Sequence, residues 1–268
     1  MAGATADQVL RELNEVRANP SAYSKRMAEL LPRFRGTIYH LPGKIDLQTN
    51  EGPAAVQDCI KELQGTRPLP LFSMSQGMNR AAQDHCDECG PIGHTGHDGP
   101  NGSTMDSRIS SYGEWNGGIG ENISYGNTTA ADIVQQLLID DGLSSRGHRR
   151  NILNPKFLIV GIGAGPHSDM EYMCTIDFAQ EYTEGTGSAP VASRCPPMRP
   201  PKGAHGPPVP SHPQGDPDTS DWPEGAVGLR TQTSESTKGH QRITKITKIY
   251  TMEDGSTATE EETRTETI

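Results

Sequence analysis

The sequence predicts an α+β domain, or layered α/β/α packing, followed by a tail of different composition. Three observations support this prediction. Five amphipathic helical patterns lie within the first 140 residues, two strand-like runs follow them, and proline becomes frequent after about residue 183. Because the helices precede the strands without regular βαβ alternation, a doubly wound parallel sheet is not expected.

The first two helices are predicted from their capping residues. Thr5 and Gln8 have the spacing of a capping box, in which each side chain bonds the other residue's backbone. Asn19 followed by Pro20 is typical of an N-cap and a first helical position, so a second helix is expected to begin there. Residues 32–50 are expected to form a loop.

Three further helices are predicted downstream. One covers residues 53–63, the next is capped by Ser73, and another is capped by Thr129 with Asp132. A glycine-rich loop is expected over residues 90–103. The helix after Ser73 is expected to bury one face, formed by Met78, Ala81, Ala82, His85 and Cys89.

Two strands are predicted after the helices. Residues 157–163 form a short apolar run, and residues 172–179 are rich in strand-forming side chains. The segment 165–169, Gly-Pro-His-Ser-Asp, is expected to form the turn between them.

Composition divides the chain into three parts. The globular domain is expected over residues 5–183. Eleven of the chain's 21 prolines lie between residues 190 and 223, so residues 184–238 are predicted to be a disordered linker. Residues 239–268 are expected to form either a β-hairpin or a disordered tail.

The hairpin alternative depends on the Asp-Gly pair at residues 254–255, which favours a two-residue turn. Such a turn would place Lys248 opposite Glu261, which attracts, and Lys245 opposite Arg264, which repels. Because an isolated two-stranded hairpin is marginal in water, this segment is expected to need a partner or to stay disordered.

Composition and charge exclude some classes of function. The net charge is -10, and an acidic chain lacks the basic face that general nucleic-acid binding needs, so no nucleic-acid partner is expected. Only 32% of residues are hydrophobic and 5% aromatic, which indicates that part of the chain builds no core. No segment has the length and apolarity of a membrane span.

The N-terminal residues and the cysteines bear on the compartment. No basic region or apolar run typical of a signal peptide is visible at the N-terminus. Five cysteines leave at least one unpaired, and an odd count favours a reducing compartment over a secreted disulfide scaffold. A cytoplasmic location is therefore favoured, with an extracellular one as the alternative.

Three short polar motifs carry most of the candidate chemistry. They are residues 93–96, Gly-His-Thr-Gly, residues 120–123, Gly-Glu-Asn-Ile, and residues 145–153, Ser-Arg-Gly-His-Arg-Arg-Asn-Ile-Leu. Two imidazoles and a carboxylate brought together can hold a metal ion or perform acid–base chemistry. Asp140 and Asp141 add acidic groups, although an Asp-Asp-Gly sequence is also a simple helix end.

A second cluster suggests a local zinc site. It consists of His85, Cys86, Cys89, His94 and His97, and Cys-x-x-Cys is a common zinc half-site. Cys86 is expected in the middle of a helix, and the histidine spacing is shorter than in most structural zinc sites. The favoured interpretation is therefore packing at a helix end beside polar loop histidines.

The order and spacing of six motifs resemble the CAP superfamily, which comprises cysteine-rich secretory proteins, antigen 5 and pathogenesis-related proteins of group 1, also called SCP-like domains. The resemblance covers roughly residues 5–183 and is closest to the microbial and protist branch. The motifs are residues 13–20 (Leu-Asn-x-x-Arg-x-Asn-Pro), 81–85 (Ala-Ala-Gln-Asp-His), 93–96, 120–122, 147–153 and 161–163 (Gly-Ile-Gly).

This resemblance implies a three-layer α-β-α sandwich with a cleft lined by two histidines and two acidic residues. By motif these are His94, His148 and Glu121, and the second acid is assigned to Asp141. The neighbouring supporting residues are Asn122, Asp140 and Ser145. The family is associated with sterol and lipid binding, divalent-metal binding, signalling and, rarely, proteolysis.

Three functional hypotheses follow. The leading one is a non-enzymatic binding module, in which His94 and His148 hold a divalent cation such as zinc and a lipid, sterol or protein ligand docks above. The first alternative is a hydrolase, using either a metal-bound water or Ser144 or Ser145 activated by His148. The second is a scaffold whose tail binds a membrane surface or a protein partner. Catalysis is the less favoured interpretation.

Overall fold

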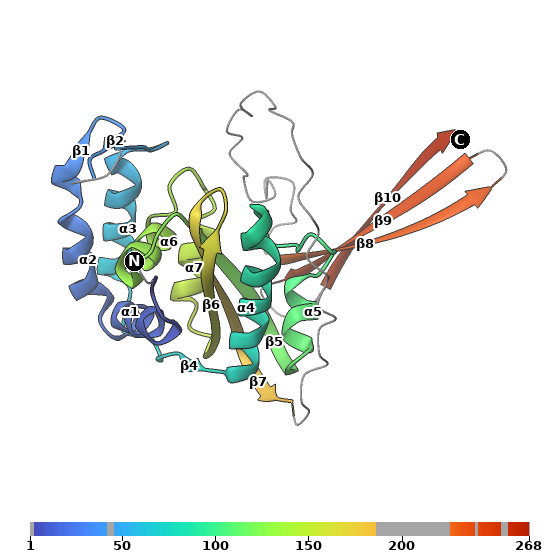
Figure 1. Cartoon of the computed structure of the whole chain (residues 1–268), viewed down its shortest axis with the longest axis horizontal. Helices are drawn as coiled ribbons and strands as arrows, with labels where there is room; N and C mark the ends of the chain where they lie inside the picture. The colour runs from blue at the N-terminus through green and yellow to red at the C-terminus, as the bar shows by residue number, and fades with distance from the viewer. Residues whose placement is uncertain (1–2, 42–45, 186–225, 239–240, 253–256, 268) are drawn as a thin grey trace. The chain divides into compact units, whose positions relative to one another are not determined.

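The computed structural model describes residues 3–41, 46–185, 226–238, 241–252 and 257–267. The chain forms two compact units, Met1–Gln214 and Gly215–Ile268. The first unit combines helices with a mixed sheet, which confirms the predicted α+β class (Figure 1).

The first unit contains helices and short 3₁₀ turns. They are α1 (Ala6–Ala18), α2 (Pro20–Ala28), α3 (Pro53–Gly65), α4 (Gln76–Cys89), α5 (Met105–Ser110), α6 (Ala130–Ile139) and α7 (Gly147–Leu153), with the 3₁₀ turns η1 (Leu31–Arg33) and η2 (Gly90–Ile92). Its strands are β1 (Phe34–Arg35), β2 (Ile38–Tyr39), β3 (Leu47–Gln48), β4 (Ser73–Met74), β5 (Gly113–Tyr125), β6 (Ile159–His167) and β7 (Glu171–Glu184).

The main sheet has four strands in the order β4-β6-β7-β5. β4 pairs with β6 in parallel, and β7 pairs antiparallel with both β6 and β5. Helices α4 and α5 lie on one side of this sheet, and α1, α2, α3, α6 and α7 lie on the other (Figure 1). The first unit is thus a three-layer α-β-α arrangement in which β5 is an edge strand.

Alternating side chains of the sheet pack into the hydrophobic cores on its two faces. Ile176 and Phe178 of β7 pack into the larger core with residues of α1, α3 and α6. Met173 and Ala179, on the other face of the same strand, pack in two smaller clusters with residues of α4 and α5. This period of two is the usual pattern of a strand that is buried on both faces.

Helix α4 packs directly on the backbone of β6. A Cβ at Gly161 would overlap the main-chain carbon of Met78, and a Cβ at Gly163 would overlap that of Ala82. Only glycine permits so close an approach, so the Gly-Ile-Gly sequence sets the distance between the helix and the sheet. All the α4 residues that the sequence assigned to an inward face are buried.

A buried arginine ties the N-terminal helix to the rest of the domain. Arg17 donates hydrogen bonds to the carbonyls of Pro70 (2.6 Å), Ile152 (2.8 Å), Asn154 (2.9 Å) and Phe157 (3.0 Å). Burial lowers the pKa of this guanidinium to about 10, and the backbone carbonyls satisfy its donors in place of water.

The predicted helix starts are mostly confirmed. Thr5 and Gln8 form the capping box of α1, and the side chain of Asn19 caps α2 at Pro20. Thr129 caps α6. The predicted cap at Ser73 is wrong, because Ser73 belongs to β4 and its N–H bonds the carbonyl of Leu158. Ser75 caps α4 instead, accepting a hydrogen bond from Met78.

Several elements were not predicted. The expected loop at 32–50 contains the short strands β1, β2 and β3, and α5, β5 and α7 lie in segments with no strong periodicity. Strand β5 includes four glycines, which hide its alternation. The predicted strands also extend further, so β6 reaches His167 and the expected turn at 165–169 shifts toward residues 168–170.

The second unit contains three antiparallel strands, β8 (Ala226–Lys238), β9 (Gln241–Met252) and β10 (Thr257–Thr267), in the order β10-β9-β8. The β9–β10 register places Lys248 opposite Glu260 and Lys245 opposite Thr263, so the pairing predicted from a two-residue turn is wrong by one residue. Thr251 pairs with Thr257, which needs a longer connection than two residues. The expected turn residues 254–255, and residues 186–225 of the expected linker, lie outside the described residues.

In the part of the chain that the structure describes, no helix has the length and apolarity needed to cross a membrane.

The glycine contact between α4 and β6 generates a matched pair of substitutions. We expect Gly163→Ala to destabilise the domain by about 1–3 kcal/mol, because the added methyl group must displace the backbone of α4. At Gly165 a Cβ would lie 3.9 Å from the Gln83 side chain, so Gly165→Ala is expected to cost much less. Urea unfolding of both variants measures the difference, and equal losses would contradict this account.

Candidate functional site

His148 and Asp140 form a close pair where α6 meets α7. Oδ1 of Asp140 lies 2.7 Å from Nδ1 of His148, and its Oδ2 accepts a hydrogen bond from the His148 backbone N–H at 2.9 Å. Asp140 ends α6 in the left-handed conformation, with φ 54°, which turns its side chain toward the start of α7. The carboxylate is nearly buried, whereas the side chain of His148 is 18% exposed.

Two arginines hold the connection that carries this pair. Arg149 is fully buried and donates to the carbonyls of Leu138 and Ile139 at the end of α6. Its guanidinium also bonds Asp58 and Glu62 of α3, both at 2.8 Å. Arg146 donates to the carbonyl of Asp140 itself at 2.7 Å. Since these contacts satisfy the last carbonyls of α6, they fix where Asp140 and His148 meet.

Asp141, to which the sequence assigned the second acid, lies elsewhere. Its two carboxylate oxygens accept hydrogen bonds from the backbone N–H groups of Asn50 (2.7 Å) and Glu51 (2.8 Å). Asp140 and not Asp141 is therefore the carboxylate beside His148. Asp140 ends α6 in the left-handed conformation, and this backbone turn directs the side chains of Asp140 and Asp141 to different neighbours.

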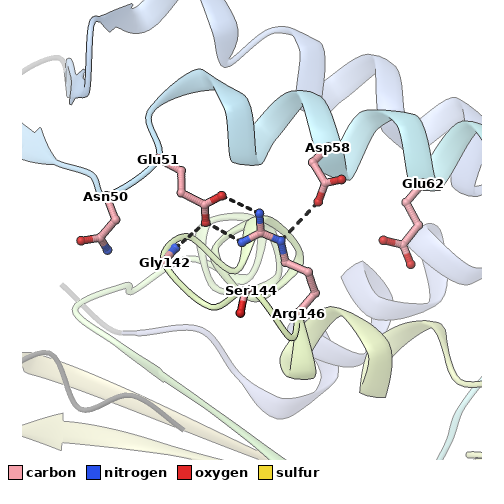
Figure 2. Close-up of a pocket in the computed structure, with 7 residues that line it drawn as sticks. All are labelled: Asn50, Glu51, Asp58, Glu62, Gly142, Ser144 and Arg146. Carbon is pink, nitrogen blue, oxygen red and sulfur yellow. Dashed lines mark hydrogen bonds and ion pairs between the residues drawn. The ribbon is translucent and has the colours of Figure 1, made fainter. Parts of the chain in front are cut away.

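An open pocket of about 600 Å³ lies beside this connection (Figure 2). Its lining is polar and charged, and consists of Asn50, Glu51, Asp58, Glu62, Gly142, Ser144 and Arg146. Arg146 spans the pocket, bonding Glu51 through two nitrogens at 2.6 and 2.7 Å and Asp58 at 3.2 Å (Figure 2). These ion pairs account for the charged lining of the pocket as structural contacts. None of the candidate histidines lines the pocket.

A second histidine–carboxylate pair forms on β5. Oε1 of Glu121 lies 2.7 Å from Nδ1 of His97, and its Oε2 accepts a hydrogen bond from Arg108 at 2.7 Å. Burial alone would raise the pKa of Glu121. The hydrogen bond from His97 and the charge of Arg108 outweigh burial, so this pKa lies below its ordinary value. Glu121 is thus held as a carboxylate inside the domain.

Asp177 lies next to Glu121 across the β5–β7 ladder and is fully buried. Burial, and then the negative charge of Glu121, raise the pKa of Asp177 well above its ordinary value. Among the described residues, neither carboxyl oxygen of Asp177 accepts a hydrogen bond. The pKa values of the two neighbouring acids are therefore shifted in opposite directions, that of Glu121 downward and that of Asp177 upward.

Among the described residues, no hydrogen bond or ion pair joins His94, the first histidine assigned by motif, to Glu121. Its Nε2 lies 2.9 Å from the carbonyl oxygen of Asp98, and its own carbonyl lies 3.0 Å from Nε2 of His167. The sequence did contain the needed signal, because the Gly-His-x-Gly pattern of residues 93–96 is repeated at residues 96–99. His97 occupies the second copy.

The supporting residue Asn122 connects β5 to α7. Its Nδ2 donates to the carbonyl of His148 at 2.9 Å, and its Oδ1 accepts from Asn151 at 2.9 Å. Glu121 and Asn122 are consecutive strand residues, so they point to opposite faces of the sheet. The two histidine–acid pairs are therefore attached to opposite faces of one edge strand.

The serine and cysteine candidates are separated from these pairs. Among the described residues, no hydrogen bond joins Ser144 or Ser145 to His148, and Ser144 is exposed. Cys86 contacts the hydroxyl of Thr175 at 3.5 Å, away from His94 and His97. Within the same residues, one group of three potential metal ligands stands together, His85, Glu88 and Cys89, and this group could hold a metal ion.

The described cysteines are buried, free thiols at positions 59, 86, 89 and 174. Burial raises the pKa of Cys59 and Cys86 to about 12 and that of Cys89 to about 11. At neutral pH these groups are thiols and not nucleophilic thiolates. Cys195 lies outside the described residues.

Comparisons with known proteins agree with the sequence motifs. The CAP family model, described as the cysteine-rich secretory protein family, matches residues 10–178, more than half of the chain. A relative from Bacillus subtilis (strain 168), the uncharacterized protein YkwD, is 31% identical over 104 residues. These residues cover 38% of this chain and 37% of YkwD, so the chain spans well under two thirds of that relative.

Two solved structures are similar to part of the chain. An extracellular protein containing an SCP domain from Bacillus anthracis str. Ames has a TM-score of 0.35 and 24% identity, covering 47% of this chain and 38% of its own. An outer surface protein from Borrelia burgdorferi has a TM-score of 0.36 and 15% identity, covering 61% of this chain and 93% of its own. Both TM-scores are too low to support a conclusion about this chain.

The raised pKa of Asp177 predicts a specific pH dependence of stability. Its raised pKa means that the folded state keeps a proton that the unfolded state loses above about pH 4, so the contribution of this group to wild-type stability falls as pH rises. The substitution Asp177→Asn removes this loss of stability with rising pH, because the asparagine side chain does not titrate. We expect the variant to gain stability relative to wild type with rising pH, by up to about 1.4 kcal/mol per pH unit.

Urea unfolding between pH 4 and pH 8 measures this difference, with Asp87→Asn on the exposed side of α4 as the control. A constant difference between Asp177→Asn and wild type across this range would show that Asp177 is ionised in the folded protein.

Proposed function

This chain belongs to the CAP, or cysteine-rich secretory protein, family, and we propose that its CAP domain is a non-enzymatic binding module. In this proposal the two histidine–acid pairs, His148 with Asp140 and His97 with Glu121, bind a divalent cation, with zinc as the best candidate. His97 and Asp140 replace His94 and Asp141 in the set expected from the motifs.

The observation that carries the proposal is the way Asp140 holds His148. Metal-binding histidines commonly donate one ring N–H to a carboxylate, which fixes the ring and makes the other nitrogen a better ligand. Asp140 occupies this position at Nδ1 of His148. Among the described residues, no hydrogen bond reaches Nε2 of His148, and the ring is partly exposed, so a cation can approach it.

The second pair repeats this arrangement at Nδ1 of His97, with Glu121 held in turn by Arg108. The pairs belong to opposite faces of the sheet, and β5 lies at the edge of that sheet. Side chains from the two faces of an edge strand can meet beyond it, whereas those of a central strand are separated by its neighbours. The position of β5 thus supports a shared site.

The ligand of the module is proposed as a lipid, a sterol or a protein segment that docks beside the cation. The charged lining of the pocket in Figure 2 suits a polar group better than an apolar chain. Hydrolysis is the alternative, and a metal-bound water is its most direct route. The free, buried thiols support the expectation of a reducing compartment.

Zinc binding tests the proposed site. We expect the full chain to lose one equivalent of bound zinc in the double variant His97→Ala/His148→Ala, measured by calorimetric titration. Asp140→Asn is expected to weaken binding at the same site by about 10–100-fold, because it removes the carboxylate that orients the imidazole.

His40→Ala provides the matched control, since Nδ1 of His40 also lies 2.7 Å from a carboxylate, that of Asp46, on the exposed surface. The proposal fails if the double variant binds zinc with the affinity and stoichiometry of wild type, or if His40→Ala lowers binding equally.

A further inference from the structure

Helix α4 presents three different metal-ligand types on one face. His85, Glu88 and Cys89 are spaced i, i+3 and i+4, which places their side chains together on a helix. Their ligand atoms all lie within 4.8 Å of one another. His85 and Cys89 are fully buried, whereas Glu88 is partly exposed. An ion could therefore reach the group from solvent on the side of Glu88.

Two of the three distances within this group match those between the ligands of a tetrahedral zinc ion, and the third, between Glu88 and Cys89, is at most 4.8 Å. Nδ1 of His85 lies 3.4 Å from Oε1 of Glu88 and 3.6 Å from Sγ of Cys89. Zn–N and Zn–O bonds of about 2.0–2.1 Å and Zn–S bonds of about 2.3 Å, at tetrahedral angles, give separations of roughly 3.3 Å for N···O and 3.6 Å for N···S. No large rearrangement of the helix is needed to close the three ligands around an ion.

Neighbouring groups already orient two of the ligands. Nε2 of His85 lies 2.9 Å from the carbonyl oxygen of Gly96, so Nε2 carries the proton and the Nδ1 lone pair faces Glu88 and Cys89. The hydroxyl of Ser103 donates to Glu88 at 2.5 Å. Such contacts from a carbonyl and a hydroxyl are typical of the groups that surround metal ligands.

The loop between α4 and α5 closes over the group. A Cβ at Gly99 would overlap Oε1 of Glu88 and Oγ of Ser103, so a larger residue at position 99 would have to displace these two side chains. An ion bound here would therefore link α4 to the loop that carries His97 through the Gly96 carbonyl and Ser103.

One positive charge lies close to the group. Arg108 is 3.8 Å from Oε1 of Glu88, which disfavours a cation, but its closer partner is Glu121 at 2.7 Å. Since Glu121 neutralises this guanidinium, the carboxylate of Glu88 and the sulfur of Cys89 remain available to balance the charge of a divalent ion.

We propose that His85, Glu88 and Cys89 form a zinc site separate from the two histidine–acid pairs. Its nitrogen, sulfur and oxygen ligands suit zinc, whereas calcium and magnesium prefer oxygen ligands alone. Three protein ligands leave the fourth tetrahedral position to water or to an external ligand. This proposal does not depend on the proposed function, because the two sites share no ligand.

Cobalt(II) titration of the full chain tests the site, since cobalt replaces zinc and a bound thiolate adds a near-ultraviolet charge-transfer band. We expect wild type to show this band, Cys89→Ser to lose it, and Cys86→Ser and Cys195→Ser to keep it. Cys86 is the matched control, because it lies on the same helix, is also buried and contacts Thr175 instead.

Glu88→Gln serves as the second variant, since it is partly exposed and conserves shape. We expect it to keep the band and to weaken cobalt binding at least tenfold, on the order of the loss when one charged ligand is removed. The double variant His97→Ala/His148→Ala should leave the band unchanged, which separates this site from the proposed cleft site.

Three results would overturn the proposal. They are the absence of the band in wild type, its persistence in Cys89→Ser, and unchanged cobalt affinity in Glu88→Gln. If Cys89→Ser does not fold, the comparison of Glu88→Gln with wild type decides the question.

Discussion

The close contact between helix α4 and strand β6 is the constraint on which the geometry around His97 and the α4 ligand group depends. Gly161 and Gly163 let the helix lie directly on the sheet. This contact fixes the height of α4 above the strands and therefore the position of the loop that leaves its C-terminus. That loop carries His97 to Glu121, and the last turn of the helix carries the three potential metal ligands. A larger residue in β6 would move both groups together.

The domain then fixes its polar groups with buried arginines in place of disulfides. Arg17 binds four carbonyls from two later segments, and Arg149 binds the end of α6 and two acids of α3. Arg108 holds Glu121. A planar guanidinium has several donors in fixed directions, so one side chain can satisfy carbonyls from elements far apart in sequence. The four described cysteines contribute as buried thiols.

Electrostatics shifts the pKa values of the two acids that pair across β5 and β7 in opposite directions. His97 and Arg108 face Glu121 and lower its pKa, whereas burial and the charge of Glu121 raise the pKa of Asp177, one strand away. Asp140 serves as an acceptor for the ring and the backbone of His148. The carboxylates of Glu121 and Asp140 thus each lie beside the Nδ1 atom of an imidazole.

The sequence by itself determined the family, most of the helix caps and the residue types of the candidate site. Caps are local, so their signals can be read within a few residues, as at Asn19. Only the tertiary structure decided which neighbour takes part: His97 and not His94 meets Glu121, and Asp140 and not Asp141 meets the second imidazole. Each choice lies between similar residues at most three positions apart. It is settled by the direction of the backbone, which depends on packing against distant elements.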